Sequence, residues 1–408
     1  MSERENEASS ASSQTNPGAI VAGFSGWLLD AFDFFLVTFC LTAMAHEFHK
    51  SDAEIALAFT MTLIFRPVGG FLFGLLADRY GRRKPLMINM AAYAVAGIVT
   101  GLVPSYTWLL VVRAAFGIVM GGTWGVGASL AMEGAARHRR GVLSGLLQEG
   151  YAAGNVLAAV LYFFLFDRLG WRWLFILSSL PALPLVWYIL RHVKESTVWQ
   201  QTARKRVSWA EQYREILSHW KLFLYLLVFM TAMMFASHGT QDMYPTFLQR
   251  QWHMTPERRA VITGISALGA IVGGLVFGYL SDKQGRRRAI ITAFILGALL
   301  IPVWAYAPNV TLLVAGAFLM QFMVQGAWGV IPAHLSELSP DSVRALLPGF
   351  AYQTGGVLAG SVGYLEALFA GRTSYATAMA LTALTVFVVA SFMAFLGRER
   401  HGHSFGSA

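Results

Sequence analysis

Charged residues and cysteine are both scarce in this chain of 408 residues. Asp, Glu, Lys and Arg make up 13% of the sequence and hydrophobic residues 56%, against about 25% and about 45–50% in a soluble domain. So small a charged fraction disfavours a water-soluble globular protein. Because Cys40 is the single cysteine, an intrachain disulfide and a cysteine cluster for zinc or iron–sulfur are excluded as well.

Patterns for metal binding and catalysis are also missing. The run His46-Glu47-Phe48-His49 lacks the spacing of a zinc peptidase, and no nucleophile and base arrangement is visible. We therefore expect no metal, no cofactor and no enzymatic activity. The 31 Lys and Arg exceed the 22 Asp and Glu, but they lie in short clusters between apolar stretches, so we expect no nucleic-acid partner.

Long apolar segments dominate the sequence instead. Six segments of about 20 residues, enough to cross a bilayer, are followed by a polar stretch and by six more. The sequence predicts an all-α membrane protein with twelve transmembrane helices in two six-helix bundles. The expected spans are 20–44, 53–77, 85–103, 107–131, 141–165, 171–190, 219–242, 258–281, 289–306, 310–333, 343–366 and 373–396.

Polar segments set the expected domain boundaries. The start of the chain is rich in Ser, Glu and Asn and lacks the features of a signal peptide, so we expect a disordered tail and an uncleaved first helix. The basic stretch in the middle is typical of an interfacial linker. The expected order is tail 1–19, first bundle 20–190, linker 191–218, second bundle 219–396 and tail 397–408.

The basic residues predict the orientation in the membrane. If both termini lie on one side, that side carries 22 of the 31 Lys and Arg, and the opposite side carries seven. The positive-inside rule then places both termini and the linker in the cytoplasm. We expect a multi-pass protein of the cell membrane, of the bacterial inner membrane type, that works as a monomer.

An internal repeat relates the two halves. A shift of 204 residues superposes Gly74–Lys84 on Gly278–Arg288, and it also pairs Trp124 with Trp328, Glu133 with Glu337, and Arg140 with Arg344. Two parallel six-helix halves with Gly-x-x-x-Asp-Arg-x-Gly-Arg-Arg after the second helix resemble the major facilitator superfamily. The resemblance implies a conformational latch at this loop, formed by Asp78, Arg82, Glu133, Asp282 and Arg286.

Arg66 breaks the repeat, because the same shift pairs it with Ala270. It precedes Asp78 by 12 residues, about 18 Å along a helix, which places it near the membrane midplane. A charge at that depth is a candidate functional site, and a guanidinium offers a planar fork for a carboxylate. The alternative is a structural ion pair with Asp30 or Asp33, and the two interpretations are compatible.

The seventh span carries a second unsymmetrical group. His238 and Asp242 are four residues apart, hence on one helical face, where they could share a proton; an interfacial pair is the alternative. The run Ser-His-Gly-Thr-Gln-Asp from Ser237 resembles the Jen-type lactate and pyruvate permeases, in the sialate:proton symporter branch of the superfamily, although Met234 stands where their motif usually begins with Asn. The resemblance implies that His238 and Asp242 serve proton coupling and that Arg66 binds the substrate carboxylate.

Polar residues in other spans complete the expected site. Asp30 is a further proton-coupling candidate, unless it only neutralises an arginine. Glu149 and its repeat partner Gln353 are expected to line both walls of the cavity, with interhelical hydrogen bonding as the alternative. We expect substrate binding by Arg66, Gln353, His238, Tyr151 and Asn155, and proton coupling by Asp242, His238, Asp30 and Glu149.

The function predicted from these features is symport of a proton with a small organic-acid anion by alternating access. The resemblance favours import of a monocarboxylate such as lactate or pyruvate. One alternative keeps the fold and changes the cargo to sialic acid or another larger acid. A second alternative is a sensor on a transporter fold that moves no solute.

Overall fold

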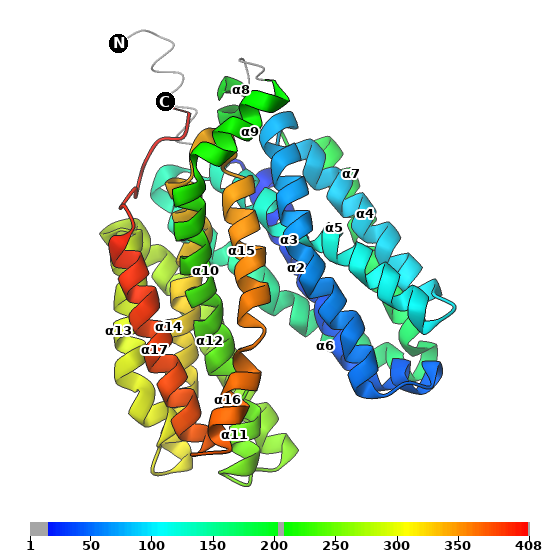
Figure 1. Ribbon diagram of the computed structural model, residues 1–408, viewed down its shortest axis with the longest axis vertical. Helices are drawn as coiled ribbons and strands as arrows, with labels where there is room; N and C mark the ends of the chain where they lie inside the picture. The colour runs from blue at the N-terminus through cyan, green and yellow to red at the C-terminus, as the bar shows by residue number, and fades with distance from the viewer. Residues whose placement is uncertain (1–14, 203–207, 407–408) are drawn as a thin grey trace.

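The structure is a computed structural model that describes residues 15–202 and 208–406, and within these ranges it consists of helices and connecting turns (Figure 1). The all-α prediction is thus confirmed. Most of the expected first tail lies outside these ranges, so the prediction that it is disordered lies largely outside the described residues. Five positions of the expected linker, 203–207, lie outside them as well. The first helix begins at Pro17, three residues before the expected span.

The first bundle contains six long helices. They are α2 (Pro17–Phe48), α3 (Asp52–Tyr80), α4 (Arg83–Leu102), α5 (Tyr106–Glu133), α6 (Arg140–Ser179) and α7 (Ala182–His192), with a 3-10 turn η1 (Arg137–Arg139) before α6. Two short helices, α8 (Thr197–Thr202) and α9 (Trp209–Ser218), lie in the linker region.

The second bundle repeats this order with two interruptions. Its helices are α10 (Trp220–Gln241), α11 (Tyr244–Arg250), α12 (Pro256–Gln284), α13 (Arg286–Ala305), α14 (Val310–Leu338), α15 (Leu346–Ala359), α16 (Val362–Ala370) and α17 (Tyr375–Leu396), with a 3-10 turn η2 (Asp341–Val343) before α15. The expected eleventh span is therefore two helices, α15 and α16, which are separated at Gly360 and Ser361.

Ten helical stretches in the described ranges are long and apolar enough to cross a membrane. Two differences from the twelve expected spans explain this number. The fifth and sixth spans form one stretch, Arg137–His192, because helix α6 continues through a kink at Gly170. The eleventh span is too short in each of its two pieces to be counted.

Local sequence signals fix where the helices begin and turn. Ser105 and its repeat partner Asn309 cap α5 and α14, since each side chain accepts the backbone N–H of the third residue after it. Gly81 and its repeat partner Gly285 have φ of 95° and 97°, a conformation that favours glycine. The same turn therefore follows the second helix of each bundle.

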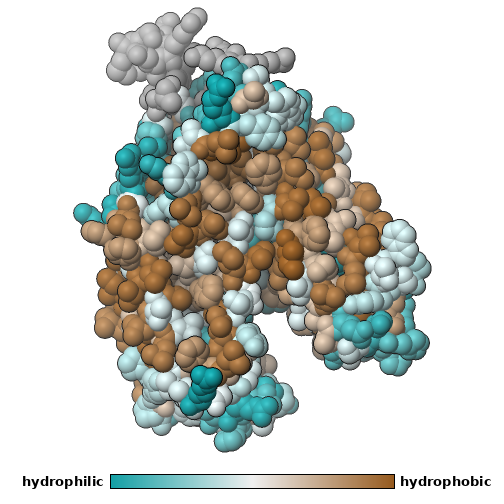
Figure 2. All heavy atoms as spheres, in the orientation of Figure 1, coloured by the Kyte–Doolittle hydropathy of each residue, from teal (hydrophilic) through white to brown (hydrophobic). Residues whose placement is uncertain are grey.

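The two bundles converge at one end and diverge at the other (Figure 1). The linker and the described chain ends lie at the converging end, which we call the closed end; the other is the open end. Figure 2 shows a hydrophobic band across this face of the molecule and a hollow between the bundles at the open end. Helices α3, α5 and α6 pack against α12, α14 and α15.

Glycines allow this close contact between the bundles. A Cβ added to Gly125 of α5 would lie 2.7 Å from the Cα of Gly349 of α15, and one added to Gly141 of α6 would lie 2.3 Å from the carbonyl oxygen of Gly278 of α12. Small residues let helix backbones approach in this way. Gly125 and Gly141 therefore serve helix packing.

Candidate functional site in the centre of the membrane region

Arg66 is buried and forms an ion pair. Its guanidinium on α3 contacts the carboxylate of Asp30 on α2, and the residue is 8% exposed. The structural ion pair considered above is thus present. Arg66 Nε and Asp30 Oδ1 have no hydrogen-bond partner among the described residues, so the pair retains one donor and one acceptor for another group.

Asp33 has a different arginine as its partner. Its carboxylate lies 2.8 Å from Arg113 of α5, which also donates to the Thr62 hydroxyl at 3.1 Å. Both charged residues are buried inside the first bundle. Asp33 therefore neutralises Arg113, and of the two aspartates of the first span only Asp30 contacts Arg66.

Aromatic rings lie between the two bundles, beside the Arg66–Asp30 pair. Tyr352 of α15 stacks on Trp124 of α5 with ring centres 4.1 Å apart, and Trp27 of α2 stacks on Tyr151 of α6 at 5.6 Å. Trp27 and Tyr352 meet edge to face at 5.8 Å. Tyr352 was not among the predicted site residues, although it precedes Gln353 and occupies the repeat position of Gln148.

Tyr151 connects the two halves of the predicted site. It packs on Phe34, whose ring lies 6.0 Å from the Arg66 guanidinium. The Tyr151 hydroxyl is also within electrostatic range of Arg66, Asp30 and Asp242. Asn155, one helical turn further along α6, is exposed, and no hydrogen bond of its side chain is recorded in the described part of the chain.

Glu149 and Gln353 occupy equivalent places but do not form a facing pair. Gln353 packs on Gly70 of α3 and donates to the carbonyl oxygen of Gly121 at 3.2 Å. Glu149 packs on Gly274 of α12, which is the repeat partner of Gly70. The structure thus separates them onto two different contacts between the bundles, because the pseudo-twofold axis runs between these contacts.

His238 and Asp242 form the predicted pair on α10. His238 Nδ1 lies 3.1 Å from Asp242 Oδ2, and the two side chains are 37% and 43% exposed. The adjacent stripe of α10 is joined to α14, since Gln325 donates to Ser237 at 2.9 Å and Gln241 donates to Gln321 at 2.7 Å. The pair is therefore fixed on its helix while its side chains remain accessible.

Sequence reasoning missed Gln321 and Gln325. Gln321 also donates to the hydroxyl of Thr240 at 3.0 Å, so both amides hold α10 against α14. A signal was present, because the repeat partners of these two glutamines are Gly117 and Gly121. Like Arg66, a polar residue inside a span whose repeat partner is not polar is a candidate functional residue.

The predicted latch residues meet at the closed end. In the first bundle, Arg82 lies 3.0 Å from Glu133 and 3.2 Å from Asp78. In the second, Arg286 lies 2.9 Å from Glu337 and 2.8 Å from Asp282. The structure therefore brings all five predicted residues into two equivalent clusters, with Glu337 completing the second.

Two repeat-related arginines connect these clusters across the bundles. Arg140 lies 3.0 Å from Glu337, and Arg344 lies 3.3 Å from Glu133. The ring of Phe405 lies 3.8 Å from each of these guanidinium groups. The second tail is thus part of the closed end at Phe405, a contact that the sequence did not indicate.

A pair of glutamates, also missed, supports both clusters. Glu195 accepts the backbone N–H of Arg82 at 2.8 Å, and its repeat partner Glu399 accepts the backbone N–H of Arg287 at 2.9 Å. Each lies where the chain leaves its bundle. The 204-residue shift pairs Glu195 with Glu399, so applying the shift to the residues after the last span of each half would have identified both.

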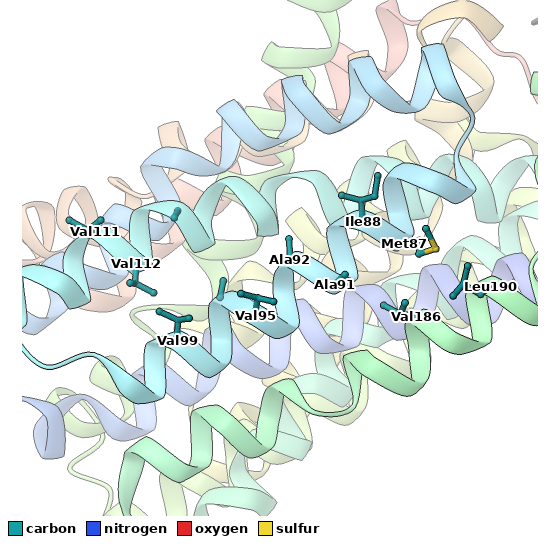
Figure 3. Close-up of a pocket in the computed structure, with 12 residues that line it drawn as sticks. Met87, Ile88, Ala91, Ala92, Val95, Val99, Val111, Val112, Val186 and Leu190 are labelled. Carbon is teal, nitrogen blue, oxygen red and sulfur yellow. The ribbon is translucent and has the colours of Figure 1, made fainter.

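A separate apolar groove lies on the outer face of the first bundle, between α4, α5 and α7 (Figure 3). Its volume is about 710 Å³, and it is lined by aliphatic side chains and Met87. Ile88, Val95 and Val111 on this face are more than half exposed, as expected for a surface in contact with lipid chains. The groove holds none of the predicted site residues.

The family model of the Major Facilitator Superfamily matches residues 23–255 and again residues 243–407. The chain belongs to the major facilitator superfamily. It is a multi-pass membrane transporter and not an enzyme. Its fold agrees with that of the proton:xylose symporter XylE bound to 6-bromo-6-deoxy-D-glucose, with a TM-score of 0.77 at 17% identity over 95% of this chain and 97% of that one.

Several superfamily relatives have names that refer to organic acids or their lactones. A carboxylic acid transporter protein homolog of Saccharomyces cerevisiae is 29% identical over 93% of this chain and 67% of its own length. A probable 4-methylmuconolactone transporter of Cupriavidus pinatubonensis is 32% identical over 93% and 90%. The sialic acid transporter NanX of Escherichia coli is 27% identical over 92% and 95%.

Proposed function

We propose that this transporter is a symporter that imports a small monocarboxylate, such as lactate or pyruvate, together with a proton. The observation that carries the proposal is the buried Arg66–Asp30 pair, whose guanidinium lies 6.0 Å from the ring of Phe34, on which Tyr151 packs. The names of the yeast and bacterial relatives support an organic acid as cargo. The proposal includes function as a monomer.

The orientation follows from the positive-inside rule. We place the basic closed end and both termini in the cytoplasm of a cell whose inner membrane holds the protein, with residues 20–190 and 219–396 as the two moving bundles. The hollow between the bundles at the open end in Figure 2 is then the outward-facing entrance. The clusters around Arg82 and Arg286 hold the cytoplasmic side shut.

Charge balance gives the mechanism. Arg66 has one carboxylate partner, Asp30, and a second carboxylate from the substrate competes with it. When a proton neutralises Asp30, the guanidinium is released to bind the substrate anion with two hydrogen bonds. Substrate and proton enter together, the site stays neutral, and no uncompensated charge is buried during closure.

Each remaining predicted residue has a place in this mechanism. The exposed His238–Asp242 pair takes up a proton from the open end and passes it inward. Tyr151 and Gln353 border the bound anion from α6 and α15, Asn155 lies toward the entrance, and Glu149 at the contact with α12 is a secondary proton acceptor. Release follows when the cytoplasmic side opens and the proton leaves to higher pH.

The test uses purified protein in liposomes. A pH gradient with the outside more acidic is expected to drive accumulation of labelled lactate. A membrane potential alone is expected to have little effect, because one anion and one proton carry no net charge. Uptake that ignores the pH gradient contradicts the proposal. Protein that binds acids but moves none would be a sensor instead.

The rival cargo is a larger acid such as sialic acid, which the Escherichia coli relative is named for. A competition panel separates the two: unlabelled lactate, pyruvate, 2-oxoglutarate and sialic acid are added in turn to labelled lactate uptake. Inhibition by the monocarboxylates at the lowest concentrations supports the proposal. Stronger inhibition by sialic acid favours the alternative.

A further inference from the structure

Glu366 on α16 is a buried carboxyl group that the transport mechanism above does not use. The residue is 1% exposed. Neither carboxyl oxygen makes a well-aligned hydrogen bond among the described residues, and the side chain of Thr382 is the polar group close enough to interact with it. Among the ion pairs of the described chain, none includes Glu366. An ionised carboxylate in such a place is costly.

Two other helices of the second bundle, α10 and α17, surround Glu366. We call their contact with α16 the seam. A Cβ added to Gly239 of α10 would lie 3.4 Å from Glu366 Oε1 and 2.9 Å from the methyl group of Thr382 on α17. The same point lies 3.6 Å from Val362, at the first turn of α16. Glu366 therefore occupies the contact of α16 with α10 and α17.

Few charged or titratable groups face this carboxyl. On α10, Asp242 is within electrostatic range of it, and Asp242 is in turn paired with His238. On α17 the polar neighbour is Thr382, and on α16 itself Tyr364 is 68% exposed and points outward. A negative charge on Asp242 further disfavours a second negative charge on Glu366.

The backbone separates α16 from the preceding helix. The eleventh membrane segment is broken between Ala359 and Val362, so α16 is not a continuation of α15. A Cβ added to Gly363 would lie 4.0 Å from the Cβ of Asp242, so the half-helix borders the exposed His238–Asp242 pair. A shift of α16 would change the wall of the open end.

We propose that Glu366 is a proton-binding site that holds α16 against α10 and α17 while it is protonated. Loss of that proton leaves an unpaired charge in the seam, and the charge is relieved when α16 moves and water enters. Low pH at the open end therefore keeps the half-helix seated, and high pH releases it. The proposal concerns this helix alone and does not require that the protein be a symporter.

Thiol labelling tests the proposal directly, because the single native cysteine, Cys40, is fully buried. Val362→Cys places a reporter in the seam, where Val362 is 2% exposed, and Tyr364→Cys places a matched control on the exposed face of the same helix. The ratio of their labelling rates in liposomes divides out the pH dependence of an exposed thiol, and the same ratio with Glu366→Gln controls for the different ionisation of the buried one. This ratio is expected to rise with pH, by up to about tenfold for each pH unit.

Glu366→Gln keeps the shape of the neutral carboxyl and cannot ionise. In this background the ratio of Val362→Cys to Tyr364→Cys labelling is expected to stay low at every pH. A ratio that is independent of pH in the parent protein, or a rise that persists with Glu366→Gln, overturns the proposal. If Glu366→Gln does not fold, the parent ratio and Glu366→Asp decide, since the shorter acid must retain the pH response.

Transport assays keep this proposal distinct from the proposed function. If lactate uptake ignores the pH gradient while the labelling ratio still rises with pH, proton symport is wrong and the Glu366 site stands. If uptake follows the gradient while the labelling ratio is flat, symport stands and the Glu366 site is wrong.

Discussion

Asp78 and Asp282, 204 residues apart, make equivalent contacts from the two bundles. Asp78 of the first bundle accepts the backbone N–H groups of Ala345 and Leu346 at 3.0 and 2.9 Å, where α15 begins. Asp282 of the second bundle accepts those of Gly141 and Val142 at 2.7 and 3.0 Å, where α6 begins. Each carboxylate thus caps a helix of the other bundle, where the helix dipole favours negative charge.

Loss of either helix cap, at Asp78 or at Asp282, is expected to shift the equilibrium between the shut and the open state of the closed end. Asp78→Asn removes the charge and one of the two acceptor oxygens, which costs about 1–2 kcal/mol of contact between the bundles. Distances between spin labels on the two bundles should show the closed end opening about five- to thirtyfold more often. Asp282→Asn should act equally, and Asp52→Asn, an exposed change on α3, should have no effect.

Replacing the planar guanidinium of Arg66 is expected to lower the affinity for lactate. Arg66→Lys keeps the positive charge but replaces two parallel hydrogen bonds by one ammonium contact. Because a charge-assisted hydrogen bond contributes about 1.5–3 kcal/mol, lactate binding should weaken by about ten- to hundredfold. Calorimetric titration of the purified protein measures the change. Unaltered affinity would exclude Arg66 from the binding site.

Asp30 predicts a change in the pH dependence of binding. In the parent protein a falling pH protonates Asp30 and releases Arg66, so lactate affinity should rise as pH falls. Asp30→Asn leaves Arg66 without its competitor at every pH, so its affinity should be high and independent of pH. Accumulation driven by a pH gradient should be lost, while exchange of labelled for unlabelled lactate continues. An unchanged pH dependence would argue against Asp30 as a coupling group.

The Asp33–Arg113 pair predicts a loss of stability without a specific loss of affinity. Asp33→Asn leaves the guanidinium of Arg113 buried without a counter-charge, which costs about 3–5 kcal/mol. Thermal unfolding in detergent should show a clear decrease in midpoint. Lys50→Gln breaks a surface ion pair with Glu54 and serves as the control, since exposed pairs contribute little. Equal midpoints for the two variants would contradict the assignment.

Phe405 predicts a role for the second tail in keeping the closed end shut. Phe405→Ala removes two cation–π contacts, with Arg140 and Arg344, each worth about 0.5–1 kcal/mol at accessible sites. The same spin-label distances should show an increase in opening comparable to that of Asp78→Asn, because the two contacts together contribute about 1–2 kcal/mol. Phe163→Ala, on an exposed face of α6, is the matched aromatic control and should leave the distances unchanged.

The sequence singled out residues that the structure brings together. The shift of 204 residues pointed to Asp78, Arg82, Asp282 and Arg286, which lie in two equivalent clusters, and their role as a latch stays a prediction. The shift could not show that Glu149 and Gln353 belong to separate contacts, since that depends on where the axis between the bundles runs. It also gave no sign that Phe405, in the tail after the last expected span, lies beside these clusters.

Apolar length and the repeat were sufficient to predict the all-helical membrane fold and its two halves, because each is written in local hydrophobicity or in a constant offset. The family was indicated by the resemblance of the motif after the second helix. The tertiary structure alone decided the partners. Asp30 and Asp33 are three residues apart and share a helical face, so only the rotation of α2 against α3 and α5 assigns Asp30 to Arg66 and Asp33 to Arg113. The isolation of Glu366 likewise depends on packing, because burial without a partner is a property of surrounding helices and not of the residue's neighbours in sequence.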